Sequence, residues 1–284
     1  MKIGIIGAGK VGTTLGKYLK EAGAGITGYY SRTKESADEA ATFTRTTSYE
    51  TLQELVEAGD TVFVTTPDDA IEGVWQQLRQ LDIQKNIICH FSGSLSSYVF
   101  SGIEESDAYG ISIHPMYAFS DKFTSYREFH TAYLTMEGDS YALEQMKPFW
   151  EKLGHTVLTL RAEDKIKYHA AAALASNAMV GLFQTSLELL EECGFDREIS
   201  RHLLTPLVQG NVEAMLKKGC EAALTGPVER GDEKTVQKHL QALQGGGAEE
   251  IYRSLGEKLV SLAMSKNPDR DYSQMQELFR KESD

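Results

Sequence analysis

A glycine-rich turn near the start of the chain carries the clearest chemical signal. It reads Gly7-Ala8-Gly9-Lys10-Val11-Gly12, follows a short apolar run and opens an amphipathic segment. This is the G-x-G-x-x-G pattern in the strand-to-helix setting that dinucleotide binding requires. Gly7 permits a tight turn, Gly9 lets the backbone approach a diphosphate, and Gly12 allows close packing of helix and strand. The helix N-terminus would bind the anion, and the plain alternative is a joint without a ligand.

The second apolar run ends in a basic, hydroxyl-bearing turn, Ser31-Arg32-Thr33, followed by Lys34. An NAD site normally places an acidic residue there to hold the ribose hydroxyls, and none is present. A guanidinium flanked by two hydroxyls suits a 2′-phosphate, because it binds phosphate through two parallel hydrogen bonds. The turn therefore favours NADP(H) over NAD(H), with a solvated basic turn as the alternative.

Polar residues also follow the later apolar runs, at strand ends that border the ligand crevice in open α/β sheets. Thr66 and Pro67 follow the third run, and Pro67 would shape the loop beneath the cofactor. Ser92 follows the fourth run, where its hydroxyl could bind a substrate carboxylate. His114 ends the fifth run and could donate to a substrate oxygen. For His114, as for His90, a purely structural histidine stays open as the alternative.

A long alanine-rich segment in the second half carries polar residues on one face. At about 100° per residue, Lys165, His169 and Ser176 fall within roughly 40° of one another, with Asn177 about 80° from His169. Reduction of a carbonyl or imine needs a hydride and a proton. Lys165 or His169 could supply the proton while Ser176 or Asn177 orients the substrate. The alternative is a solvated Lys165 and a His169 that serves packing alone.

These residues need a framework of strands and helices, and the first part of the chain alternates short apolar runs with amphipathic segments. Such alternation is typical of βαβ units. The predicted strands span residues 2–7, 25–30, 61–65, 86–90, 110–114, 133–137 and 156–160. The predicted helices between them span residues 10–22, 48–58, 71–81 and 140–153.

Helical patterns alone follow residue 161, over residues 162–192, 200–218, 233–243 and 248–264. The predicted fold is therefore α/β: a Rossmann-type, doubly wound, mostly parallel sheet followed by an all-helical C-terminal domain. The predicted domains are an NADP-binding domain over residues 1–161 and a helical substrate and dimerisation domain over residues 162–284. A length of 284 residues suits two domains of about 150 residues each.

The composition excludes several classes of protein. Apolar residues make up 41% and charged residues 25%, as in an ordinary globular chain. A formal net charge of −12 without a basic block argues against a nucleic-acid partner. Three scattered cysteines indicate neither a disulfide framework nor a metal site. Without a signal peptide or a long apolar stretch, we expect a cytoplasmic protein that does not contact membranes.

Several of these motifs together resemble a known group of proteins. The group comprises bacterial two-domain proteins with a Rossmann-like N-terminal domain and a helical C-terminal domain of unknown function, DUF2520. Its layout is similar to that of pyrroline-5-carboxylate reductase, deazaflavin-dependent NADP reductase and 6-phosphogluconate dehydrogenase. The matching segments are residues 7–12, 31–33, 92–93, 114–115, 168–172, 176–177, 224–227 and 230–232.

The resemblance implies an NADPH-dependent reductase of a small, anionic substrate. Some members look like alternative ketopantoate reductases, which would make a 2-oxoacid the substrate, and a homodimer built on the helical domains is implied as well. The wider superfamily commonly carries a lysine followed four residues later by an asparagine. Lys165 matches the lysine, but His169 stands in place of the asparagine. The alternative is therefore an NADP(H)-binding regulatory or sensor protein without turnover.

Overall fold

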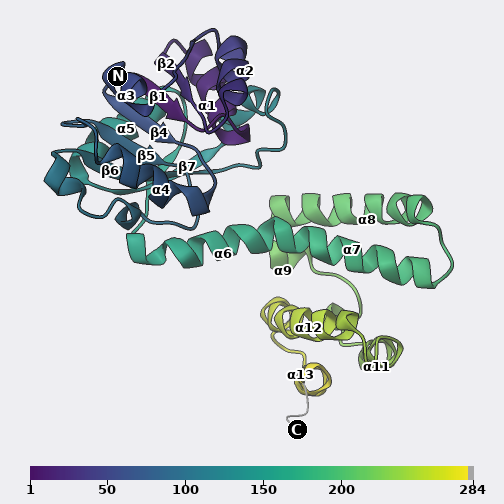
Figure 1. The fold of residues 1–284 in the computed structure, drawn as a ribbon. Helices are drawn as coiled ribbons and strands as arrows, with labels where there is room; N and C mark the ends of the chain where they lie inside the picture. Colours follow the sequence, from purple (N-terminus) through teal and green to yellow (C-terminus); the bar gives the residue numbers. More distant parts are fainter. Residues whose placement is uncertain (281–284) are drawn as a thin grey trace. The chain divides into compact units, whose positions relative to one another are not determined.

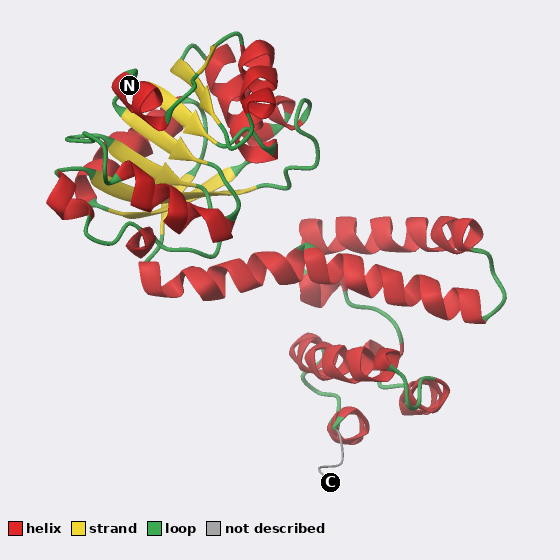
Figure 2. Cartoon of the chain, viewed as in Figure 1, coloured by secondary structure: helices red, strands yellow, loops and turns green. Residues whose placement is uncertain are grey.

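The computed structural model describes residues 1–280 (Figures 1 and 2). Contacts within the chain divide it into two compact units, Met1–Leu174 and Ala175–Asp284. The sequence placed this boundary at residue 161. In the structure, the next thirteen residues belong to the unit that contains the sheet. Among residues 1–280, no helix has both the length and the apolar character needed to cross a bilayer.

One eight-stranded sheet forms the centre of the first unit in the described part of the chain. Its strands are β1 (Lys2–Ile6), β2 (Gly25–Tyr30), β3 (Thr47–Ser48), β4 (Thr61–Val64), β5 (Ile87–His90), β6 (Tyr109–Met116), β7 (Tyr133–Gly138) and β8 (Val157–Thr159). The spatial order is β3-β2-β1-β4-β5-β6-β7-β8. Neighbouring strands are parallel except for β6 and β7, which run antiparallel. The prediction of a mostly parallel Rossmann-type sheet is confirmed.

Helices cover both faces of this sheet, as Figure 2 shows. They are α1 (Lys10–Glu21), α2 (Lys34–Thr44), α3 (Leu52–Glu57), α4 (Asp68–Leu78) and α5 (Ser140–Lys152). The helix α6 (Lys165–Ala175) follows the 3-10 turn η5 (Ala162–Asp164). Short 3-10 turns occur at η1 (Ser97–Val99), η2 (Ile103–Ser106), η3 (Ser125–Arg127) and η4 (Phe129–Thr131).

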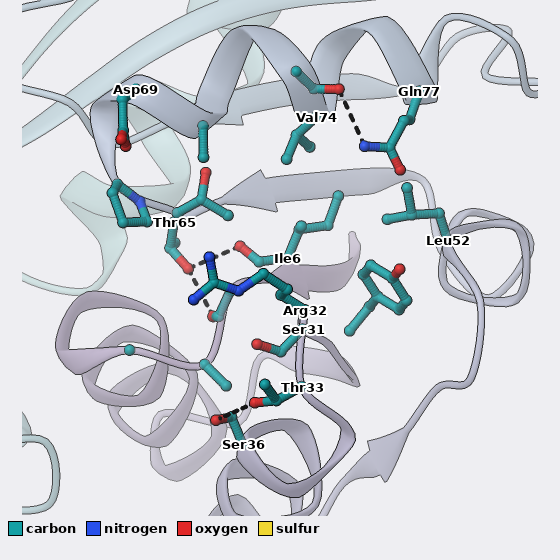
Figure 3. A pocket seen from close by; sticks show the side chains of 18 residues that line it. Ile6, Ser31, Arg32, Thr33, Ser36, Leu52, Thr65, Asp69, Val74 and Gln77 are labelled. Carbon is teal, nitrogen blue, oxygen red and sulfur yellow. Dashed lines mark hydrogen bonds between the residues drawn. The ribbon is translucent and has the colours of Figure 1, made fainter.

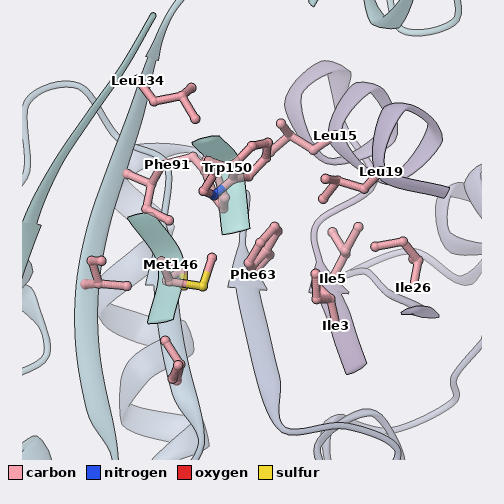
Figure 4. Close-up of a cluster of buried hydrophobic side chains, with 14 of the residues drawn as sticks. Ile3, Ile5, Leu15, Leu19, Ile26, Phe63, Phe91, Leu134, Met146 and Trp150 are labelled. Carbon is pink, nitrogen blue, oxygen red and sulfur yellow. The ribbon is translucent and has the colours of Figure 1, made fainter. Parts of the chain in front are cut away.

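Two hydrophobic cores lie against the two faces, because successive strand residues point to opposite sides. In β4, Phe63 faces one core while Val62 and Val64 face the other. The first core, drawn in Figure 4, packs β1, β4 and β7 against α1 and α5 around Trp150. The second packs the sheet against α3 and α4 around Trp75. This double burial explains why the strands read as continuous apolar runs.

The second unit is entirely helical in its described residues. Its helices are α7 (Asn177–Glu192), α8 (Arg197–Lys218), α9 (Cys220–Ala223), α10 (Pro227–Arg230), α11 (Glu233–Ala242), α12 (Gly247–Lys266) and α13 (Ser273–Phe279). The helices α10 to α13 enclose a small core that includes Val236, Val260 and Phe279. The antiparallel pair α7 and α8 buries little apolar surface, and Leu187 is the buried apolar residue on α7.

Three local predictions were wrong. The helix expected over residues 162–192 is interrupted at Ser176, which separates α6 from α7; serine and asparagine side chains compete locally for backbone hydrogen bonds there. The helix expected from residue 48 begins after Thr51, which forms a capping box with Glu54. The helix expected from residue 71 begins at Asp68, directly after Pro67.

The sequence missed α2 and β3 in the first unit, and the short helices α9, α10 and α13 in the second. The signal for α2 was present, because Ala37, Ala40 and Ala41 are spaced as one buried helical face. The two-residue strand β3 has no periodicity that a sequence could reveal.

Candidate functional site

The glycine turn after β1 is built by close contacts that leave no room for side chains. Gly7 has a φ of +101°, and a Cβ there would lie 3.0 Å from the backbone of Thr65. A Cβ on Gly12 would collide with the carbonyl oxygen of Gly7 and with the Thr65 hydroxyl. That hydroxyl donates to the carbonyls of Ile6 and Gly7 at 3.1 and 2.8 Å and so fastens the turn. The turn therefore requires glycine at both positions.

The N-terminus of α1 is open above Gly9. A Cβ at Gly9 would meet no atom within 4 Å, so space remains over this backbone. Gly9 caps the helix without a side-chain hydrogen bond, and the first backbone bond of the helix runs from Thr13 to Gly9. The N–H groups of Lys10, Val11 and Gly12 therefore have no backbone acceptor among the described residues. These groups, with the helix dipole, suit a diphosphate.

A cavity of about 730 Å³ opens from this turn, and we call it the glycine-turn pocket (Figure 3). It is lined by Ile6, Gly7, Ala8, Gly9, Tyr30, Ser31, Arg32, Thr33, Ser36, Leu52, Thr65, Thr66, Pro67, Asp69, Ala70, Gly73, Val74 and Gln77. Eight of the eleven residues that the sequence assigned to cofactor binding thus line one cavity. The other three, Lys10, Val11 and Gly12, form the first turn of the adjoining helix. A cavity of this size suits a nucleotide.

The basic turn after β2 contributes one free cation to this pocket. Arg32 is exposed and has no ion pair among the described residues, and Figure 3 shows its guanidinium within the pocket. Thr33 is the N-cap residue of α2, and its hydroxyl donates to Ser36 at 2.7 Å. Lys34 pairs instead with Glu50 at 2.6 Å and Asp38 at 3.5 Å. Arg32 is therefore the cation that an anionic group in this pocket would meet.

A second group of polar residues lies in the same unit, on β6, β7 and α6 and after β4 and β5. We call it the polar cluster, and it comprises Asp68, Ser92, Ser112, His114, Glu137, Lys165, Tyr168 and His169. Of the sequence-predicted catalytic residues, Ser92, His114, Lys165 and His169 are members. Asn177 begins α7 in the second unit, where it accepts a hydrogen bond from Ser176 at 3.0 Å, so it is not a member.

The Ser92 hydroxyl is not free, because it links the start of α4 to the loop after β5 through hydrogen bonds. Its hydroxyl donates to Asp68 at 2.7 Å and accepts from the backbone N–H groups of Ser94 and Leu95 at 3.1 and 2.9 Å. Ser94 also donates to Asp68 at 2.7 Å. A hydroxyl has one proton and two lone pairs, so these contacts use its full capacity. The neighbouring His90 is fully buried, accepts from the Ser92 N–H at 3.2 Å, and fits the structural alternative.

Lys165 is the buried cation of the polar cluster. It is 1% exposed, and its ammonium group donates to the hydroxyl of Ser112 on β6. Glu137 lies directly opposite Ser112 on β7 and is held by the N–H and hydroxyl of Ser97 at 2.8 and 2.7 Å. Burial lowers the pKa of Lys165 to about 8, and the charges of Glu137 and Asp68 oppose that shift. The ammonium is thus still the main form at neutral pH.

His114 is the neutral partner beside this cation. Burial and the charge of Lys165 lower the pKa of His114 to about 4, so the ring is uncharged at neutral pH. Its Nδ1 lies 2.9 Å from the hydroxyl of Tyr168. Its ring is 6.0 Å from that of His169, measured between centroids. A Cβ on Gly93 would lie 2.8 Å from His114 Nε2 and 2.5 Å from His169 Nδ1, so glycine is needed where both rings meet the loop.

Sequence reasoning assigned no role to four members of this cluster: Asp68, Ser112, Glu137 and Tyr168. The sequence did contain a signal for Ser112: it lies two residues before His114 on an apolar strand, so both side chains point to the same face. Another was available for Tyr168, which lies one helical turn after Lys165. The positions of Asp68 and Glu137 depend on contacts between distant strands, which the sequence pattern does not reveal.

Two protein-family models match this chain. A family model described as a Rossmann-like domain matches residues 1–115, and one described as DUF2520, a domain of unknown function, matches residues 132–259. No curated protein gives a significant match.

Among solved structures, a protein from Thermotoga maritima is 26% identical with a TM-score of 0.76, over 93% of this chain and 99% of that one. A Bacteroides fragilis protein described as a candidate NADP oxidoreductase is 24% identical with a TM-score of 0.72, over 92% and 98%. The pyrroline carboxylate reductase of Plasmodium falciparum, solved with NADP bound, is 13% identical with a TM-score of 0.62, over 99% and 98%. The similarity to the last two concerns the fold.

The lowered pKa of the buried Lys165 makes the free energy of unfolding depend on pH. Lys165 has a pKa of about 8 in the folded protein and about 10.5 when unfolded, so between these values the folded state binds fewer protons. The free energy of unfolding should therefore rise with pH, relative to a Lys165→Met variant, by on the order of 2 kcal/mol between about pH 8 and pH 10. Urea unfolding of both proteins across this range measures the difference.

Lys167→Met is the matched control, because it removes an exposed lysine from the same helix. It should leave the pH dependence of the wild-type protein unchanged. Parallel pH profiles for wild-type and Lys165→Met protein would contradict the assignment of a depressed pKa to Lys165.

Proposed function

Because the chain joins a Rossmann-like domain to a domain of the DUF2520 family, we propose that it is an NADPH-dependent oxidoreductase. Its substrate is a small carbonyl or imine compound, with an anionic 2-oxoacid resembling ketopantoate favoured. The observation that carries the proposal is the glycine-turn pocket, where an open helix N-terminus and Arg32 line one cavity. When bound, NADPH supplies the hydride for such a reduction.

The glycine-turn pocket supports NADP(H) as the cofactor. The open space above Gly9 and the free N–H groups of the first turn of α1 suit the diphosphate. Arg32 and the hydroxyls of Ser31 and Thr33 line the same pocket and suit the 2′-phosphate. Thr66 and Pro67 line the same pocket, and Asp68 follows them at the start of α4.

The polar cluster supports a role in proton transfer and substrate orientation. Either Lys165 or His169 donates the proton that accompanies the hydride. Lys165 is favoured by its depressed pKa, since a proton donor works best when its pKa lies near the working pH. His114 orients the substrate, and the orienting role of Asn177 stays a prediction from the sequence. Ser92 acts by holding Asp68 in place.

A homodimer through the helical domain is part of the same proposal. The helices α7 and α8 expose large apolar side chains, among them Val180, Leu203 and Leu207, which are 70%, 50% and 61% exposed. These two helices bury little apolar surface within the chain. Large exposed apolar side chains of this kind are typical of a protein–protein interface. A second copy of the chain would cover it.

Cofactor selectivity tests the assignment of Arg32. Arg32→Ala should raise the Kd for NADPH about 10- to 100-fold, because a hydrogen-bonded charge pair contributes about 1.5–3 kcal/mol. The Kd for NADH should change less than about threefold, since NADH has no 2′-phosphate for this side chain to bind. Lys34→Ala is the matched control and should behave as wild type, because Lys34 is already paired with Glu50 and Asp38. Equal losses for both cofactors in fluorescence titrations would refute the phosphate contact.

Turnover tests the reductase itself. The absorbance of NADPH should fall with at least one member of a panel of 2-oxoacids, including ketopantoate, cyclic imines and deazaflavin. Loss of the proton donor in Lys165→Ala or His169→Ala should lower kcat about 100-fold or more while NADPH still binds. If Lys165 is the donor, the rate should fall above about pH 8, where its ammonium form is lost. Tight NADPH binding without oxidation across the panel would favour the sensor alternative.

Sedimentation tests the dimer. The wild-type protein should sediment with twice the mass of the chain, and a Leu203→Glu, Leu207→Glu double variant should sediment as a monomer, because charge is excluded from an apolar interface. Leu158→Glu is the control, since Leu158 is similarly exposed, at 52%, in the first unit. A monomeric wild-type protein at micromolar concentration would contradict the proposed interface.

A further inference from the structure

Asp68 links the glycine-turn pocket to the polar cluster, and the proposed function gives its carboxylate no contact with a ligand. Pro67 and Asp69, its neighbours in the chain, both line the pocket. The side chain of Asp68 bonds instead to the loop after β5, where the hydroxyls of Ser92 and Ser94 each donate to it at 2.7 Å. Its carboxylate therefore lies where the cofactor pocket and the candidate catalytic residues meet.

The carboxylate of Asp68 is held in one orientation, and one of its oxygens remains available. Both serine hydroxyls donate to the same atom, Oδ2, and Oδ1 has no hydrogen-bond partner among residues 1–280. The Ser92 hydroxyl is itself fixed, because it accepts from the backbone N–H groups of Ser94 and Leu95. Asp68 thus presents a preorganised acceptor, which loses little further entropy when a donor binds.

Support for the charge of Lys165 does not explain why this acceptor is exposed. Burial lowers the pKa of Lys165 to about 8, and the charges of Glu137 and Asp68 oppose that shift. Glu137 is only 4% exposed, and Ser97 binds both of its oxygens. Asp68 is exposed, so water screens its charge. A carboxylate needed only for Lys165 would be buried as Glu137 is, so the exposed oxygen of Asp68 indicates a further role.

The order of the strands assigns Asp68 to the second half of a dinucleotide site. The sheet order β3-β2-β1-β4-β5-β6 reverses direction between β1 and β4. In sheets of this order a dinucleotide binds across the crevice at the reversal, and each set of three strands serves one nucleotide. Arg32 follows β2 in the first set, whereas Asp68 and Ser92 follow β4 and β5 in the second. The two halves of the site therefore carry side chains of opposite charge.

We propose that Oδ1 of Asp68 accepts a hydrogen bond from the ribose hydroxyls of the nicotinamide nucleoside of NADP(H). This inference rests on the proposed function, which supplies the cofactor. A carboxylate binds hydroxyl donors through strong, charge-assisted hydrogen bonds. The nicotinamide ribose has both hydroxyls free, whereas the adenosine ribose carries the 2′-phosphate, which a carboxylate would repel. Arg32 and Asp68 thus distinguish the two riboses and determine the direction in which the cofactor binds.

Calorimetric titration of the full-length protein with NADPH and with 2′,5′-ADP tests this contact. The second ligand contains the phosphorylated adenosine but lacks the nicotinamide nucleoside. Asp68→Ala should raise the Kd for NADPH about 10-fold, because a hydrogen bond to a charged group is lost. The same variant should change the Kd for 2′,5′-ADP less than about twofold. Equal losses for the two ligands, or unchanged binding of NADPH, would overturn the proposal.

Two further variants separate the contact from general effects of charge and folding. Glu72→Gln is the matched control, because it removes an exposed carboxylate one turn further along α4 that does not line the pocket, and it should bind both ligands as wild type does. Asp68→Asn retains an oxygen that can accept from Ser92 and Ser94. It should raise the Kd for NADPH about fivefold, because a neutral amide replaces the charged acceptor. If Asp68→Ala does not fold, wild-type affinity for NADPH in Asp68→Asn would refute the contact.

A cofactor analogue separates the ribose from the nicotinamide carboxamide, which also has N–H donors for a carboxylate. In the 3-acetylpyridine analogue of NADPH, a methyl group replaces the amide nitrogen and the ribose is unchanged. The loss of affinity in Asp68→Ala should remain about 10-fold with this analogue. A loss that disappears would assign Asp68 to the carboxamide and refute the ribose contact. A wild-type protein that binds neither NADPH nor 2′,5′-ADP would instead contradict the proposed function itself.

Discussion

The arrangement of the polar cluster depends on the free-energy cost of burying the ammonium group of Lys165. Taking an unpaired charge out of water costs several kcal/mol unless hydrogen bonds and opposite charges offset it. Lys165 meets this requirement through Ser112 and through the fields of Glu137 and Asp68. Each carboxylate needs an anchor of its own, which Ser97 provides for Glu137 and Ser92 for Asp68. The serines after β5 therefore hold the two carboxylates whose charges stabilise the ammonium of Lys165 on α6.

The antiparallel strand β7 makes this arrangement possible. In an otherwise parallel sheet, it brings Thr135 and Glu137 opposite His114 and Ser112, with each pair on one face. Two residues along a strand advance about 7 Å, while residues three apart on a helix are about 5–6 Å apart. The near match lets Lys165 and Tyr168 on α6 reach successive positions of β6. The single reversal of strand direction therefore coincides with the polar cluster.

The glycine turn could be predicted in full because its determinants are local. Gly7, Gly9 and Gly12 lie within one turn; close contacts require glycine at positions 7 and 12, while the space above Gly9 is open. The polar cluster could be predicted only in part. His114 and Lys165 were identified by residue type, but Asp68 lies 24 residues before Ser92, and the direction of β7 has no sequence signature. Ser176 looked like part of a continuous helix because serine in a helix costs too little to reveal a break.

The loop between β4 and α4 joins the glycine-turn pocket to the polar cluster. Thr65 fastens the glycine turn, and Pro67 lines the pocket. Asp68, the next residue, begins α4 and accepts from Ser92 and Ser94. Because a proline fixes the backbone between them, a shift of the glycine turn would move the Asp68 carboxylate as well. The charge of that carboxylate raises the pKa of Lys165. The bonds that shape the pocket therefore also influence the protonation of Lys165 in the polar cluster.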